Sequence, residues 1–148
     1  MAKNASTARK QAEPKLLELV KRWEDTYNEN VEAMVSECYN PTASVYFTGG
    51  EVHGKDQFLR LEKAILAAAP GRKMRVDRVI LAGDDTVVVE AVVLNDEDPG
   101  YSSPFCAILT VRDGKILLDH TYLEPQRWPG IEAGAPHVTP GGLGKKSK

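Results

Sequence analysis

The sequence predicts one α+β domain in which a strongly curved antiparallel sheet wraps around N-terminal helices and encloses a pocket. Three observations support this prediction. The chain has 148 residues, the length of a single domain. Its helical patterns lie before residue 71, and its longest succession of strand patterns follows from residue 72 to 124. Helices and strands segregated along a chain are typical of α+β folds, and a sheet curved around a helix leaves a natural ligand cavity.

Two helices are expected before the first strand. Residues 1–13 are rich in Ala, Lys, Ser and Thr and read as a flexible segment, after which Pro14 suits the first turn of a helix. The inner face of this helix is predicted from apolar residues at steps of three and four, namely Leu16, Val20, Trp23 and Tyr27. A short second helix carries Val31, Met34, Val35 and Cys38 and ends at Asn40-Pro41.

A strand, a third helix and a four-strand meander complete the predicted domain. Residues 43–48 form the strand, and Gly54-Lys55-Asp56 opens the helix with Asp56 as its N-cap. The meander is expected over residues 72–82, 86–95, 103–112 and 115–124, with Asp113-Gly114 as a hairpin turn. Residues 129–148 form a Gly/Pro-rich tail with little helix or strand, so the domain is assigned to residues 14–128.

Charge and cysteine usage restrict the possible partners. The formal net charge is −2, and although basic residues gather at both ends, no aromatic residues are interleaved with them, so neither nucleic acid nor an anionic membrane is an expected partner. The first fifteen residues are polar, and the apolar runs are too short to cross a bilayer. Cys38 and Cys106 both lie in apolar surroundings, which fits a reducing compartment. We therefore expect a cytoplasmic protein.

The order of elements and four local motifs resemble the nuclear transport factor 2-like superfamily, in its SnoaL-like branch. The motifs are Trp23 to Asn28, Tyr39 to Phe47 (YNPTASVYF), His53 to Phe58 (HGKDQF) and Arg112 to Ile116 (RDGKI). The resemblance covers roughly residues 14–128 and implies a cone-shaped fold and a homodimer. Similar proteins include SnoaL-like polyketide cyclases, ketosteroid isomerases, scytalone dehydratases and limonene epoxide hydrolases. Other members only bind ligands or serve as dimerisation modules.

Two known catalytic sets do not carry over through this resemblance. Ketosteroid isomerases use a Tyr on the first helix, an Asp late in the sheet and an Asp on the first strand, and those places hold Trp23, Cys106 and Phe47. None of the three can act as a carboxylate base or strong acidic donor. Epoxide hydrolases use an Arg and two Asp residues, where this chain has Glu90, Val92 and Thr121. Any chemistry must therefore depend on other residues.

Glu90 is the first candidate acid or base. It lies inside VVVEAVVL, residues 87–94, a run expected to be buried on much of both faces. A carboxylate there must be paired, hydrogen-bonded or protonated, and a raised pKa would suit it for proton transfer. A salt bridge or a subunit interface is an equal alternative. Arg78 is the candidate partner; it either points inward or lies on the surface beside a β-bulge that resets the alternation, and we prefer the bulge.

The last strand supplies the other candidates. Alternation places Asp119 and Thr121 on one face and His120, Tyr122 and Glu124 on the other. The resemblance to epoxide hydrolases favours the Asp119 face toward the pocket. Asp119 or His120 could act as the base, although an outer-face position at which relatives dimerise is preferred for His120.

The remaining predicted pocket residues are mostly apolar. The walls are assigned to Trp23, Phe47, Val92, Cys106 and Leu123. Tyr27 and Tyr46 could donate hydrogen bonds to a ligand or could be ordinary core tyrosines, while His53 and His137 read as surface residues. The spacing of the histidines suggests no metal, and no cofactor is expected.

Two functions remain open at this point. The first is a cofactor-free isomerase, cyclase, dehydratase or epoxide hydrolase that acts by acid-base chemistry on an apolar substrate of polyketide, steroid or terpenoid type. The second is a non-catalytic module that binds an apolar ligand or dimerises. Loss of both known catalytic sets favours the module, and Glu90 in an apolar strand favours the enzyme.

Overall fold

The computed structural model of the chain describes residues 2–144, with side chains from residue 12 onward. Met1 and residues 145–148, the end of the predicted tail, lie outside the described residues. Within that part of the chain the helices are α1 (Ala2–Glu29), α2 (Val31–Cys38) and α3 (Lys55–Ala68), followed by the 3₁₀ helices η1 (Pro125–Arg127) and η2 (Ile131–His137). The strands are β1 (Tyr39–Phe47), β2 (Gly50–His53), β3 (Arg72–Leu81), β4 (Thr86–Asn95), β5 (Ser102–Arg112), β6 (Lys115–Tyr122) and β7 (Thr139–Pro140).

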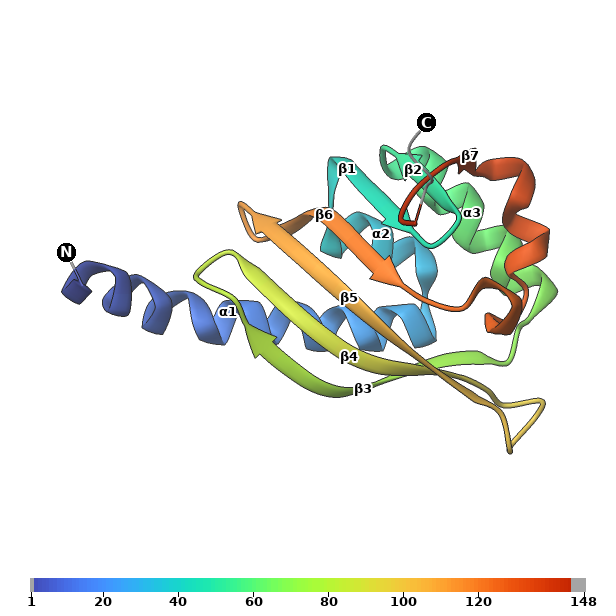
Figure 1. The fold of residues 1–148 in the computed structure, drawn as a ribbon, viewed down its shortest axis with the longest axis horizontal. Coiled ribbons are helices and arrows are strands. Elements are labelled where there is room, and N and C mark those ends of the chain that lie inside the picture. The colour runs from blue at the N-terminus through green and yellow to red at the C-terminus, as the bar shows by residue number, and fades with distance from the viewer. Residues whose placement is uncertain (1, 145–148) are drawn as a thin grey trace.

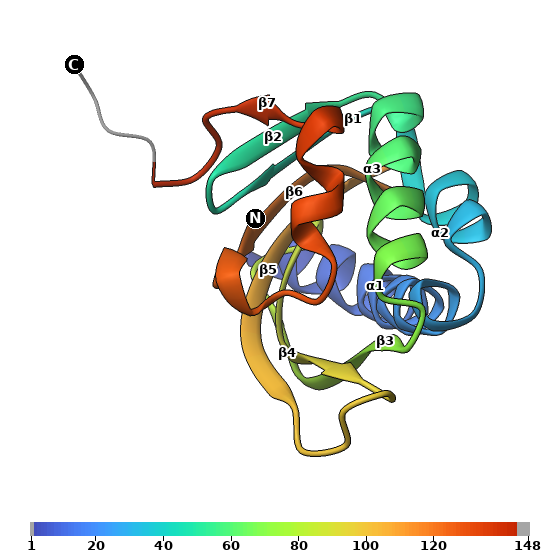
Figure 2. The same ribbon diagram turned by 90° about the vertical axis from the view of Figure 1, so that its right-hand side faces the viewer.

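All seven strands belong to one curved, unclosed sheet in the order β3-β4-β5-β6-β1-β2-β7. Neighbouring strands run antiparallel except β1 and β6, which are parallel. Figure 2, which looks along α1, shows β3 to β6 curving around this helix, with α2 and α3 on its other side. The predicted α+β cone and its four-strand meander are confirmed.

Alternation along the strands places the core on the concave side of the sheet. In β4 the buried residues are Val87, Val89, Ala91 and Val93, and in β5 they include Phe105, Ala107 and Leu109. They pack against the predicted face of α1, where Leu16, Val20, Trp23 and Tyr27 are all buried. The three-to-four-residue spacing therefore identified the inner face of the helix correctly.

The boundaries of two helices differ from the predictions. α1 begins at Ala2 instead of Pro14, and its first turns project beyond the sheet (Figure 1). Residues 2–13 contain Ala, Lys, Gln and Glu, which are strong helix formers, and Pro14 removes a single hydrogen bond without ending the helix. At α3 the N-cap is Gly54, with φ of 83°, instead of Asp56, which lies in the first turn.

The C-terminal segment, residues 125–144, is the largest departure from the predicted tail. It contains two 3₁₀ helices and the short strand β7, which pairs with β2 through Gly50 and Glu51. Gly134 is buried against Leu61 of α3, where an added Cβ would come 2.3 Å from the Leu61 Cδ1. Because the residue at 134 has no side chain, η2 can lie directly on α3 (Figure 2).

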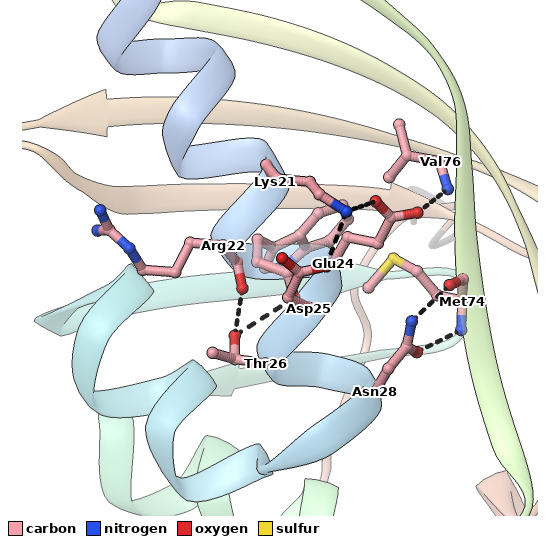
Figure 3. A network of polar contacts seen from close by, with 9 residues as sticks. Lys21, Arg22, Glu24, Asp25, Thr26, Asn28, Met74 and Val76 are labelled. Atoms are coloured by element: carbon pink, nitrogen blue, oxygen red, sulfur yellow. Dashed lines mark hydrogen bonds and ion pairs between the residues drawn. The ribbon is translucent and has the colours of Figure 1, made fainter.

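The edge strand β3 is protected by polar side chains of α1 (Figure 3). The Asn28 amide donates to the Met74 carbonyl (2.8 Å) and accepts from the Met74 N–H (2.7 Å), as a neighbouring strand would. The Glu24 carboxylate accepts from the Val76 N–H at 2.6 Å. These bonds satisfy backbone groups that an edge strand would otherwise leave open to pairing with another chain.

We expect Asn28→Ala to lower the free energy of unfolding by about 1–3 kcal/mol, because it leaves two partly buried backbone groups without partners. Urea unfolding measures the loss. Glu29→Ala, at the exposed neighbouring position, is the matched control and should change stability by less than about 0.5 kcal/mol. Equal stability of the two variants would contradict the proposed role of Asn28.

Candidate functional site

A largely apolar cavity lies between the concave face of the sheet, the helices and the C-terminal segment. Its volume is about 60 Å³. Helices α1 to α3, strands β1, β3, β5 and β6, and the C-terminal segment all contribute to its lining, which consists of Trp23, Tyr27, Met34, Tyr39, Val45, Phe47, Phe58, Leu61, Glu62, Ile65, Met74, Phe105, Asp119, Thr121, Leu123, Trp128 and Ile131. The cavity therefore has few polar groups in its lining.

A chain of hydrogen bonds ends at the Asp119 carboxylate in this cavity. The Trp23 Nε1–H donates to the Tyr39 hydroxyl oxygen at 3.0 Å, and that hydroxyl donates to Asp119 Oδ2 at 2.6 Å. The Thr121 hydroxyl donates to Asp119 Oδ1 at 2.6 Å. An indole N–H can only donate, so it directs the Tyr39 proton toward Asp119. Both carboxylate oxygens thus receive a donor.

Burial dominates the ionisation of this group. Asp119 is only 3% exposed, and burial raises its pKa although the hydrogen bonds from Thr121 and Tyr39 lower it. Burial and the neighbouring Asp119 charge together hold the pKa of Tyr39 well above its ordinary value, so Tyr39 stays a proton donor. A buried carboxyl with a raised pKa exchanges its proton closer to neutral pH than an exposed carboxyl does.

The raised pKa of Asp119 predicts a pH-dependent cost to folding. Below pH 3.8, the ordinary pKa, Asp119 is protonated in both the folded and the unfolded chain, and folding does not bury a charge. As pH rises above 3.8 and through the raised folded-state pKa, the folded chain must bury the charged carboxylate and the free energy of unfolding falls. The stability of Asp119→Asn relative to the native chain should therefore increase with pH above that ordinary value. Urea unfolding at several pH values measures the difference, and a constant difference would contradict the pKa shift.

Glu62 and Tyr27, which also line the cavity, are in contact with the buried Arg72 side chain. Glu62 on α3 pairs with Arg72 on β3, with 3.2 Å between Oε2 and the guanidinium nitrogen. Burial raises the pKa of Glu62 and the Arg72 charge lowers it. The guanidinium carbon also lies 3.8 Å from the centre of the Tyr27 ring. The buried Tyr27 hydroxyl makes no hydrogen bond of normal geometry among the described residues, although the Trp128 side chain lies near enough to lower its pKa. Burial outweighs this effect and raises the pKa of Tyr27, so the hydroxyl keeps its proton.

Six of the predicted site residues line the cavity: Trp23, Tyr27, Phe47, Asp119, Thr121 and Leu123. They come from α1, from the inward positions of β1 and β6, and from the residue that follows β6. The preferred face of the last strand, with Asp119 and Thr121 toward the pocket, is therefore the face that the structure shows.

The other six predicted site residues lie outside the cavity, on the outer side of the sheet: Tyr46, Arg78, Glu90, Val92, Cys106 and His120. The prediction that Glu90 is buried is wrong, because its side chain is 50% exposed and pairs with Arg78. In β4, inward residues alternate with Val88, Glu90 and Val92, so the apolar run is buried on one face and only partly covered on the other. The preferred bulge before Arg78 is present, between Val76 and Arg78.

Sequence reasoning missed Tyr39 and Glu62 as site residues. Tyr39 directly follows a helix, and its phenol reaches the cavity because β1 begins there. Glu62 lies next to Leu61 on the inner side of α3, and the spacing of apolar residues gave no reason to place a carboxylate inward. Within the part of the chain that the structure describes, no three His, Cys, Asp or Glu side chains converge as metal ligands. No described helix is long and apolar enough to span a membrane.

A helical layer inside a curved sheet, with a buried carboxylate in the lining of an apolar cavity, defines a cone-shaped α+β class of domain. The family model of the SnoaL-like domain matches residues 20–118, well over half of the chain. The chain belongs to the SnoaL-like family, as its motifs indicated. No curated protein matches its sequence significantly.

Solved structures share this fold at low sequence identity. A candidate SnoaL-like polyketide cyclase from Jannaschia sp. CCS1 has a TM-score of 0.65 at 20% identity, over 75% of this chain and 86% of that one. A candidate ketosteroid isomerase from Kribbella flavida has a TM-score of 0.62 at 16% identity, over 75% and 78%. A protein with a ketosteroid isomerase-like fold from Catenulispora acidiphila, in complex with trimethylamine, has a TM-score of 0.65 at 19% identity, over 78% and 95%.

Proposed function

We propose that the chain is a cofactor-independent enzyme of the isomerase or cyclase type, which moves a proton next to a carbonyl group of an apolar substrate. Asp119 is the proton shuttle. The observation that carries the proposal is the position of this carboxyl, buried in an apolar cavity with its pKa raised and with no cation bonded to it in the described structure. General bases are tuned toward the working pH in this way.

The substrate oxygen also needs a hydrogen-bond donor, because charge develops on it when the neighbouring proton leaves. The Tyr27 hydroxyl fits this role, since it lines the cavity, keeps its proton and donates to no acceptor in the described structure. A substrate carbonyl would supply the missing acceptor. Tyr27 and Asp119 thus form a donor and a base within one apolar enclosure.

The size of the cavity limits how such a substrate can enter. A volume of about 60 Å³ holds a few water molecules, whereas sites for drug-sized ligands have roughly 300 Å³ or more. Trp128 and Ile131 of the C-terminal segment form part of the lining. A ring-sized substrate therefore requires part of the lining to move outward. We propose that the C-terminal segment is the part that moves, since loop segments commonly gate active sites.

The small cavity also favours a second candidate, a non-catalytic module whose interior is filled by its own side chains. A direct measurement distinguishes the two candidate functions. A panel of small enolisable ketones, 1,3-diketones and lactones is incubated with the protein in D₂O, and NMR follows exchange at the carbon next to the carbonyl. Thermal shift measures binding in parallel.

If the chain is the proposed enzyme, hydrogen–deuterium exchange should exceed the buffer rate with at least one compound, and Asp119→Asn should lose this exchange. Thermal stabilisation without exchange in any compound would favour the binding module. Exchange that persists in Asp119→Asn would show that another group moves the proton. The homodimer and the apolar ligand expected from the resemblance stay predictions.

A further inference from the structure

Three polar side chains form a hydrogen-bonded series on the outer face of the sheet, away from the cavity. Ser44 on β1 lies directly opposite His53 on β2, and Glu51 precedes His53 by two residues on the same face. The neighbouring residues Val45 and Val52 point inward and are buried. The series is therefore separate from the Asp119 site, and nothing in the proposed function uses it.

The distances place serine, imidazole and carboxylate in sequence. Ser44 Oγ lies 2.9 Å from His53 Nδ1, and His53 Nε2 lies 3.1 Å from Glu51 Oε1. An ionised carboxylate can only accept hydrogen bonds, so in the neutral ring the proton belongs on Nε2. The lone pair of Nδ1 then faces the Ser44 hydroxyl and can accept its proton. A serine nucleophile, its base and an orienting carboxylate follow one another in the same order in serine hydrolases, although here Nδ1 and Nε2 have exchanged roles.

Other contacts hold the series in place. The second oxygen of Glu51, Oε2, accepts from the Gly142 N–H at 3.0 Å. The His53 ring packs edge-to-face on Tyr46 with 5.6 Å between ring centroids. The backbone N–H of His53 donates to Gln57 Oε1 at 2.8 Å. The side chains of His53 and Glu51 are 45% and 25% exposed. The base is thus oriented by its neighbours and still open to a reagent from solvent.

We propose that Ser44 is an activated nucleophile that accepts an acyl group from a carboxylic ester with a good leaving group. The Ser44 oxygen forms a bond to the ester carbonyl carbon while its proton passes to His53 Nδ1. The bond between that carbon and the leaving oxygen then breaks, and the leaving oxygen takes the proton from His53. The products are acyl-Ser44 and the free alcohol or phenol. Glu51 stabilises the imidazolium formed between the two steps.

The probe is p-nitrophenyl acetate, a small ester that an open site can admit. We expect one acetyl group per chain by intact-protein mass spectrometry, located on Ser44 by peptide mapping, together with a release of p-nitrophenol. Ser44→Ala should remove this label. His53→Gln should slow labelling of Ser44 by about 10²-fold or more, the usual range for loss of a general base. Glu51→Gln should slow it as well.

Ser102→Ala, at an exposed serine on β5, is the matched control and should be labelled at Ser44 as fast as the native chain. Thermal unfolding of each variant confirms that it is folded. Labelling confined to lysines or to other serines would overturn the proposal, as would a His53→Gln variant acetylated at Ser44 at the native rate. Neither result bears on proton exchange at Asp119, which D₂O exchange measures separately.

Discussion

Asp119→Asn should lower substrate proton exchange by about 10²- to 10⁴-fold, the range that a positioned acid or base contributes. Asparagine has the same shape and still offers a hydrogen-bonding group to both Tyr39 and Thr121, but it cannot take up a proton. Substrate binding should therefore change little while the exchange rate falls. The NMR exchange assay, run with the compound that the native chain exchanges fastest, measures the effect.

Glu90→Gln is the matched control for this experiment. It makes the same chemical change to a carboxylate on the outer face of the sheet, where Glu90 pairs with Arg78 outside the cavity. We expect its exchange rate to equal that of the native chain. If the two variants lose exchange equally, the assignment of the proton shuttle to the inner face of β6 is wrong.

Arg72→Met should lower the free energy of unfolding by about 3–5 kcal/mol, because removing one partner of a buried ion pair leaves the other uncompensated. The Arg72 side chain is 0% exposed and bonds Glu62 and the Tyr27 carbonyl. Methionine is also unbranched and apolar, so the loss of packing is small. Urea unfolding near neutral pH measures the change.

A double variant separates the charge effect from packing. Adding Glu62→Gln to Arg72→Met removes the unpaired carboxylate and should restore part of the lost stability. Arg75→Met is the control on the same strand, since Arg75 forms an exposed pair with Asp77 and should contribute less than about 1 kcal/mol. A double variant no more stable than Arg72→Met alone would contradict the role of the buried Glu62 charge.

Features that follow from local periodicity could be predicted, although the periodicity did not place Tyr46, Val92 and Cys106 on the outer face of the sheet. The face of α1 that carries Trp23 and Tyr27, the four strands of the meander and the hairpin at Asp113-Gly114 all agree with the structure. In the last strand, strict alternation kept Asp119 and Thr121 together, so one side of the cavity was present among the candidates.

The error at Glu90 has a clear physical origin. A continuous apolar run such as residues 87–94 is compatible with burial on both faces, and only the packing of neighbouring layers decides how far the second face is covered. In this sheet the helices lie on the concave side, so Glu90 faces outward opposite Arg78. The cavity likewise depends on long-range contacts, such as the hydrogen bond from Tyr39 to Asp119, which lie 80 residues apart.

The sequence by itself determined the α+β class, the SnoaL-like family, the inner face of α1 and the shared face of Asp119 and Thr121, because these depend on periodicity and local motifs. The tertiary structure alone decided which carboxylates are buried and that the C-terminal segment contributes to the lining of the cavity. Burial is set by the curvature of the sheet and by which segments pack on its concave side. That curvature places Asp119 in an apolar interior, where its pKa rises, and leaves Glu90 in contact with solvent.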